Sequence, residues 1–223
     1  MIGIVNQTGA RSGVVGTTVS QQAMTLLHNS NVNESGNAAN KTFAAAARGV
    51  GPGTTGSGYL FQTDFFYYKV FTTGYGFSNG YAAFRLVSTS NSVHTGTYYK
   101  HAMKVQDSGG TDWDHNNSSD SMFNLSQRFD HADPYGAAGT TTATAGASHL
   151  EITFYNPAGP NRTLVQWAYT QALDADSDLR TVYGSGHYTD QAAHGGFNVL
   201  SQNDGTFDGM VQCSVYGMAS TTI

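Results

Sequence analysis

The sequence has few of the residues that cross-link a chain or carry it into a membrane. It contains one cysteine and four prolines in 223 residues. A single cysteine excludes a disulfide within the chain, and no stretch approaches the roughly 20 apolar residues that span a bilayer. The N-terminus also lacks the cationic and apolar segments of a signal peptide. We therefore expect a soluble chain made in the cytosol, without a membrane partner.

Charge is scarce as well, because Asp, Glu, Lys and Arg make up only 11% of the residues. Ten basic residues stand against 15 acidic ones, and the formal net charge is −5. This balance supplies no positively charged surface of the kind that binds nucleic acid. We expect no nucleic-acid partner.

Glutamate is nearly absent, since Glu34 and Glu151 are its only occurrences. A glycoside hydrolase needs two carboxyl groups flanking the scissile bond. Glu34 lies in a Gly- and Asn-rich segment, and Glu151 alternates with apolar residues and so points outward. The Gly184-Ser185-Gly186 sequence is too short for a Gly-x-Ser-x-Gly nucleophile motif. We assign no catalytic residue and expect a protein that is not an enzyme.

Potential metal ligands are present, but not at a known spacing. Asp174, Asp176 and Asp178 match the start of a calcium loop, but Leu179 stands where that loop needs Gly and Ser185 where it needs a bidentate carboxylate. The eight histidines include no His-Glu-x-x-His pair. We expect a solvated acidic turn, no metal and no cofactor; a looser calcium site is the alternative.

The residues that are abundant favour short strands and tight turns. The chain has 27 glycines and 12% aromatic residues, together with many Thr, Ser and Asn. The fold class expected is all-β, a jelly-roll-like antiparallel β-sandwich over residues 57–223 with an extended N-terminal arm. Its strands are predicted at 59–62, 66–72, 81–88, 97–106, 121–129, 149–155, 164–170, 180–187, 197–201 and 210–218.

Period-two alternation selects the core residues of this sandwich. In the stretch 149–154, every second residue is apolar, and the same holds around Trp167. Cys213 alternates with polar neighbours in the last strand, which predicts a small core residue and not a reactive thiol. The core residues predicted in this way are Phe84, Leu86, Leu150, Ile152, Phe154, Val165, Trp167, Tyr169, Val211, Cys213 and Val215.

Residues 1–56 differ from the rest, because Gly, Ser, Thr and Asn separate short apolar islands. Such a segment cannot form a core alone. It is either a disordered terminus or an assembly arm that lies extended on a neighbouring subunit. The candidate assembly residues are Ile4, Val5, Val14 and Val15, and removing residues 1–30 should leave a folded domain.

Two loops are predicted to be exposed, at 107–120 and 130–147, and long loops of this kind are often functional. Tyr and Trp rings can stack on sugar rings. We therefore take Trp113 and Tyr135 as candidate glycan or receptor contacts, with Tyr98 and Tyr99 beside them. The alternative is that the tyrosines cover strand faces or fill subunit interfaces.

Two segments resemble a β-sandwich module of tailed bacteriophages. They are FQTDFFYYKVFTTGYGFSNGYAAFRLVSTSNSVHTGTYYKHAM (61–103) and GFNVLSQNDGTFDGMVQCSVYGM (196–218). The shared pattern is a Tyr/Phe-rich strand, a strand ending in a Ser-Thr turn, a Tyr-rich strand and a closing Tyr-Gly strand. The Gly-rich GARSGVVGTT (9–18) is similar to the leader of such modules.

The resemblance implies a non-enzymatic virion structural protein. It would be a surface-exposed subunit of the capsid-decoration (cement) or tail-associated type, anchored through its arm to other virion proteins. By analogy, it also implies a closed homo-oligomer such as a trimer. A receptor- or glycan-binding tail-fibre module, with a host surface glycan as partner, is the alternative, and a polysaccharide hydrolase is a weaker one.

Overall fold

The computed structural model describes residues 24–30, 40–43, 59–73, 76–78, 81–107, 112–125, 148–172, 179–202, 206–209 and 212–219. Throughout these residues, every regular element is a β-strand. The strands are β1 (Met24–Ser30), β2 (Asn40–Phe43), β3 (Phe65–Thr73), β4 (Gly76–Ser78), β5 (Tyr81–Ser88), β6 (Tyr99–Asp107), β7 (Asp112–Asp120), β8 (Phe123–Asn124), β9 (Ser148–Tyr155), β10 (Leu164–Ala172), β11 (Leu179–Tyr188), β12 (His194–Gln202), β13 (Thr206–Gly209) and β14 (Gln212–Ala219).

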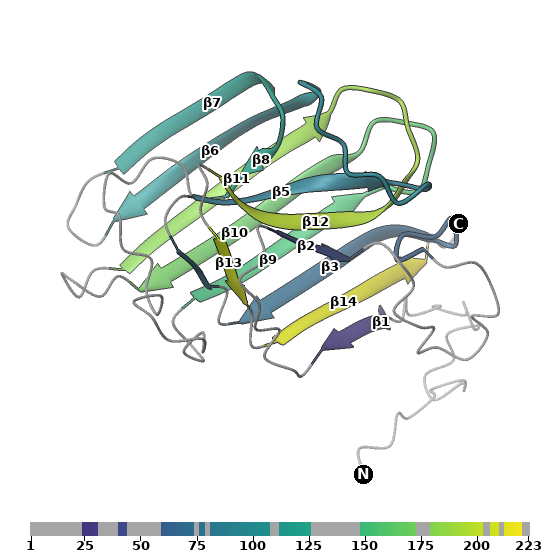
Figure 1. Ribbon diagram of the computed structural model, residues 1–223, viewed down its shortest axis with the longest axis horizontal. Coiled ribbons are helices and arrows are strands. Elements are labelled where there is room, and N and C mark those ends of the chain that lie inside the picture. Colours follow the sequence, from purple (N-terminus) through teal and green to yellow (C-terminus); the bar gives the residue numbers. More distant parts are fainter. Residues whose placement is uncertain are drawn as a thin grey trace, which may run out of the picture.

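The strands form two stacked antiparallel sheets, which confirms the predicted all-β sandwich (Figure 1). The eight-stranded sheet, here the large sheet, has the order β1-β14-β3-β9-β10-β11-β6-β7, and the four-stranded small sheet has the order β2-β12-β5-β8. A separate ribbon pairs β13 with β4. Along the chain, β2, β5, β8 and β12 of the small sheet are separated by one, two and three strands of the large sheet in turn. The chain therefore passes repeatedly between the two sheets, as in a jelly-roll-like sandwich.

Side-chain alternation explains why these segments become strands that are buried on one face. Leu150, Ile152 and Phe154 are fully buried, while Glu151 between them is half-buried and forms an ion pair with Lys69. The predicted core residues of β5, β10 and β14 that are described are buried in the same way. Of the residues predicted to form the core, those with described side chains are all buried: Phe84, Leu86, Leu150, Ile152, Phe154, Val165, Trp167, Tyr169, Cys213 and Val215. Val211 lies outside the described residues.

Aromatic rings fill the space between the sheets. Phe61 lies against Tyr68 and Phe154 of the large sheet, with ring centroids 4.7 and 5.0 Å away, and stacks on Phe197 of the small sheet at 6.3 Å. Phe84 in turn meets Trp167 edge to face. These rings join the two sheets into one hydrophobic core.

Two stretches within residues 1–56 are strands of the sandwich. β1 pairs with β14 at one edge of the large sheet, and β2 pairs with β12 at one edge of the small sheet. Leu27 and Phe43 are only 7% and 5% exposed, so both contribute to the core. The apolar islands at these positions are therefore buried within the chain itself.

Three expected elements differ from the structure. Residues 59–62 form no strand; instead, Leu60 and Phe61 are buried, and the Tyr68 hydroxyl donates a hydrogen bond to the Gln62 carbonyl. The segment predicted as an exposed loop at 107–120 contains β7, whose polar residues extend the edge of the large sheet beside β6. The strand expected at 121–129 is reduced to β8, within the part of it that is described.

Candidate binding groove on the large sheet

The outer face of the large sheet, which points away from the small sheet, carries three parallel rows of side chains. Strand register sets the rows, because residues paired across antiparallel strands lie side by side on one face. The floor row crosses β9, β10, β11, β6 and β7 and consists of Thr153, Gln166, Ser185, Ala102 and Asn116. Short or amide side chains therefore occupy the centre of the face.

Two further rows lie on either side of the floor row and include the bulky side chains of Tyr155, Leu164 and Tyr183. The first wall consists of Tyr155, Leu164, His187 and Lys100, which are paired in that order across β9, β10, β11 and β6. The second wall consists of Glu151, Ala168, Tyr183, Lys104 and Asp114, paired across β9, β10, β11, β6 and β7. The hollows that open along these rows form a groove that runs across the strands.

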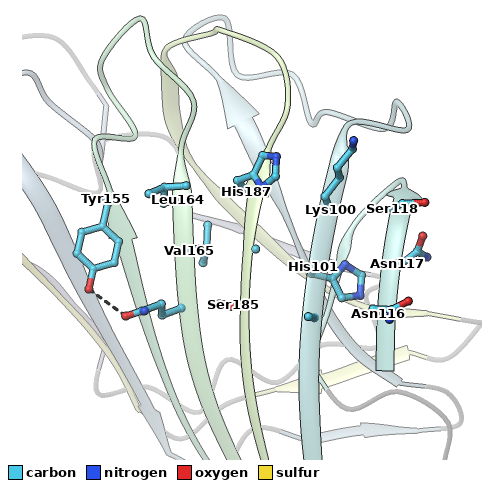
Figure 2. Close-up of a pocket in the computed structure, with 13 residues that line it drawn as sticks. Lys100, His101, Asn116, Asn117, Ser118, Tyr155, Leu164, Val165, Ser185 and His187 are labelled. Carbon is cyan, nitrogen blue, oxygen red and sulfur yellow. Dashed lines mark hydrogen bonds between the residues drawn. The ribbon is translucent and has the colours of Figure 1, made fainter. Parts of the chain in front are cut away.

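Three hollows of about 640, 580 and 510 Å³ open along this groove. Gln166 lines all three of them, and Ser185 and Ala102 line the two larger ones. Figure 2 shows the largest hollow, with Tyr155 and Leu164 on one side and Lys100 and the β7 residues on the other. Volumes of this size are typical of ligand-binding pockets. Five strands about 4.8 Å apart give the groove a length of about 19 Å.

Two glycines of β11, Gly184 and Gly186, lie where close packing beneath the floor row leaves no room for a side chain. A Cβ at Gly184 would overlap the indole ring of Trp167, which is buried directly below the groove. A Cβ at Gly186 would lie 2.5 Å from the Lys100 carbonyl oxygen. The Gly184-Ser185-Gly186 sequence is therefore a packing feature of β11, which leaves Ser185 exposed between the two glycines.

Positive charge gathers at one end of the groove. Lys100 and Arg162 are both exposed and lie close enough to His187 to lower its pKa, a shift in which burial of the imidazole is the larger cause. No carboxylate lines the largest hollow among the described residues. At the other end, Lys69 and Glu151 form an ion pair of 2.5 Å, so their charges offset each other.

Two polar side chains of the groove, Tyr155 and Gln166, are hydrogen-bonded to each other. The Tyr155 hydroxyl donates a 3.0 Å hydrogen bond to Oε1 of Gln166, shown as a dashed line in Figure 2. This contact engages the Gln166 amide oxygen and leaves its NH₂ group as a donor. The groove therefore presents both hydroxyl and amide groups.

The residues predicted as contacts are only partly within the described structure. Trp113 lies in β7 opposite Val105, but its side chain is outside the described residues, as is all of Tyr135. Tyr98 is 46% exposed. The expectation for Tyr99 is wrong, because this residue is fully buried and its hydroxyl accepts a hydrogen bond from the Leu86 amide. The arm residues Ile4, Val5, Val14 and Val15 and the acidic turn at 174–178 also lie outside the described residues.

Most of the histidines whose side chains are described contribute to packing. His101 packs beside His115 and against Trp167, and burial lowers the pKa of His101 to about 4. His94 and His194 meet at one end of the core. Within the described ranges, no group of three or more His, Cys, Asp or Glu side chains is close enough to hold a metal ion.

The groove was not predicted from the sequence. Four of its five floor residues sit at outward positions of predicted strands, and Asn116 lies in the segment predicted as a loop. The small residues Ala102 and Ser185 at outward positions were the available signal. That signal was incomplete, because the hollow exists only where these residues are paired across β6 and β11.

No protein-family model, curated protein or solved structure matches this chain. Fold and groove therefore define its class: an antiparallel jelly-roll-like sandwich with a polar and aromatic groove on its larger sheet. Over the residues that the structure describes, there is no helix with the length and apolar character needed to cross a membrane.

Proposed function

We propose that this chain is a non-enzymatic structural subunit of a bacteriophage particle, with its sandwich exposed at the particle surface. The resemblance of segments 61–103 and 196–218 to phage modules is the starting point. Two strand pairs support it: β3 of the first segment pairs with β14 of the second, and β5 pairs with β12. The two segments thus contribute jointly to both sheets, as expected if they are one structural module.

The observation that carries the proposal is the position of β1. Among the described strands, β1 is an edge of the large sheet and the first element of the chain. An edge strand offers unpaired backbone groups to another chain. In the sheet order, β14 and β3 separate β1 from β9, the first strand of the groove. Attachment through the backbone of the β1 edge would leave the β11, β6 and β7 part of the groove accessible.

Exposed apolar side chains at the same edge fit an attachment role. Met24 is 43% exposed and is paired with Met218, which is paired in turn with Tyr67 of β3. Phe66 is 50% exposed, but as the neighbour of Tyr67 on β3 it points to the opposite face of the sheet. Together with Ile4, Val5, Val14 and Val15, the Met24, Met218 and Tyr67 side chains would bury apolar area against a particle subunit or a second copy of the chain.

Truncation and labelling test the proposal. Immunogold labelling of purified particles from the phage that encodes this chain should decorate the head or the tail. Protein lacking residues 1–23 should stay folded but fail to join particles, and so should the variant in which Ile4, Val5, Val14 and Val15 are all changed to Ser. A chain that is absent from particles, or that joins them equally well without residues 1–23, would contradict the proposal.

A further inference from the structure

We propose that the groove on the large sheet binds an acidic oligosaccharide, that is, a short chain of sugar rings of which at least one bears a carboxylate. This inference goes beyond the structural role proposed above. The groove lies on the same face of the large sheet as Met24, Met218 and Tyr67, in a row that continues to Tyr155, but its ligand does not depend on which particle contains the chain.

The floor row matches the hydroxyl groups of a sugar. Ser185 and Thr153 have hydroxyl groups that both donate and accept hydrogen bonds, and the amides of Gln166 and Asn116 do the same with separate atoms. Ser185, Gln166 and Asn116 are exposed in the groove. Because these side chains project from paired strands, their spacing is set before a ligand binds, which lowers the entropy lost on binding.

The walls supply apolar surface for the ring faces of a sugar. Tyr183 and Leu164 are each 53% exposed, among the largest exposures of apolar residues in the described structure. The Tyr155 ring lines two of the hollows. Exposed aromatic and apolar side chains beside convergent polar groups are the usual composition of a small-molecule site.

The charge of the largest hollow selects an acidic sugar over a neutral one. Lys100 and His187 line this hollow and Arg162 lies close to His187, whereas no carboxylate among the described residues lines it. Neither Lys100 nor Arg162 has an ion-pair partner in the described part of the chain, in contrast to Lys69. In a protein with a net charge of −5, this local excess of positive charge favours a carboxylate ligand.

The number of cations argues against a nucleic-acid ligand. Tight binding to a phosphate backbone uses several Lys or Arg contacts along the strand. In the second wall, Lys104 of β6 is paired with the acidic Asp114 of β7, and beside the groove Lys69 forms an ion pair with Glu151. A ligand with one carboxylate at the Lys100 end of the groove and uncharged sugar rings along the floor row fits this distribution of charge better than a nucleic acid does.

The test is isothermal titration of the full chain with three probes: a trimer of galacturonic acid, the uncharged trimer maltotriose, and sodium acetate. The uronate trimer should bind saturably, and maltotriose should bind at least about tenfold more weakly, since a charged hydrogen bond is lost. Acetate should show no saturable binding. The Lys100→Met variant, which keeps most of the apolar stem, should weaken uronate binding by about tenfold or more.

Two further variants locate the binding site. Ala102→Phe places a ring on the exposed floor and should abolish uronate binding while leaving the thermal unfolding temperature within about 2 °C of the parent. Phe66→Ala removes a ring of similar exposure to Tyr183 that lies outside the groove, and it should bind normally; Tyr183→Ala should bind more weakly. The proposal is overturned if the uronate trimer does not bind at millimolar concentration, if maltotriose binds as tightly, or if Ala102→Phe leaves binding intact.

Discussion

The imidazole rings of His94 and His194 meet edge to face inside the sandwich, with their centroids 5.0 Å apart and their planes at 89°. Tyr188 packs against both rings, at 5.2 and 5.0 Å. His194 is fully buried, and neither of its ring nitrogens has a hydrogen-bond partner among the described residues. A proton on either imidazole would therefore be poorly solvated, and two protons would repel each other.

The buried histidines predict loss of stability in acid. Burial, followed by the nearby His94, lowers the pKa of His194 to about 3, and burial lowers the pKa of His101 to about 4. In the unfolded chain the pKa of a histidine is about 6.5. The unfolded state therefore binds more protons below that pH, and the free energy of unfolding should fall steadily from pH 6.5 to pH 4. Urea unfolding at a series of pH values measures this slope.

His194→Phe should reduce that slope, whatever its effect on stability at pH 7, because the variant removes one of the groups that must be protonated on unfolding. His149→Phe is the matched control, since the His149 side chain is exposed on β9. Equal slopes for His194→Phe and the parent protein would show that His194 does not contribute to acid sensitivity.

Glycines of β11 should not tolerate a side chain. Gly184→Ala would push a methyl group into the buried Trp167 ring, and Gly186→Ala would push one toward the Lys100 backbone. Each should destabilise the fold by about 1–3 kcal/mol, the usual magnitude for overpacking. Ser185→Ala, between them and exposed, should change the free energy of unfolding by less than about 0.5 kcal/mol. Chemical denaturation compares the three, and similar stabilities would be the contrary result.

The Tyr99 hydroxyl should matter more for stability than that of Tyr155. The Tyr99 hydroxyl accepts a 3.1 Å hydrogen bond from the Leu86 amide and donates a 2.9 Å hydrogen bond to the His94 carbonyl. Leu86 follows the two residues of β5 that pair with β8, Ala83 and Phe84. Tyr99→Phe leaves the Leu86 amide and the His94 carbonyl without this partner and should cost about 1–3 kcal/mol. Tyr155→Phe loses only a hydrogen bond at an exposed site and should cost about 0.5 kcal/mol or less. Equal losses in thermal unfolding would contradict the assignment.

Strand β1 should belong to the cooperative folding unit, although residues 1–23 should not be needed for it. β1 covers the edge of β14 and buries Leu27. Removal of residues 1–23 should leave the unfolding temperature nearly unchanged. Removal of residues 1–30, expected from the sequence alone to be harmless, should lower it and promote aggregation through the exposed β14 edge. Differential scanning calorimetry of the two truncations, with light scattering, tests this, and equal unfolding temperatures would be evidence against it.

Much of the architecture could be predicted because it depends on local alternation. The stretch 149–154 reveals both a strand and its buried face, since each side chain of a strand points to the opposite face from its neighbour. The same rule identified Trp167 and Cys213 as core residues. It failed for β7, whose Asp, Asn and Ser residues carry no apolar alternation. Pairing with β6 alone makes that segment a strand.

The sequence by itself therefore determined the all-β class, most strands of the sandwich and the residues of its core, because burial of one strand face requires apolar residues at every second position. Only the tertiary structure decided that β1 and β2 complete the two sheets, that Tyr99 is buried, and that Ser185 lies beside Ala102 and Gln166 in one groove. These features depend on pairing between strands distant in the chain. Strand register sets that pairing, and register depends on contacts that no local pattern contains.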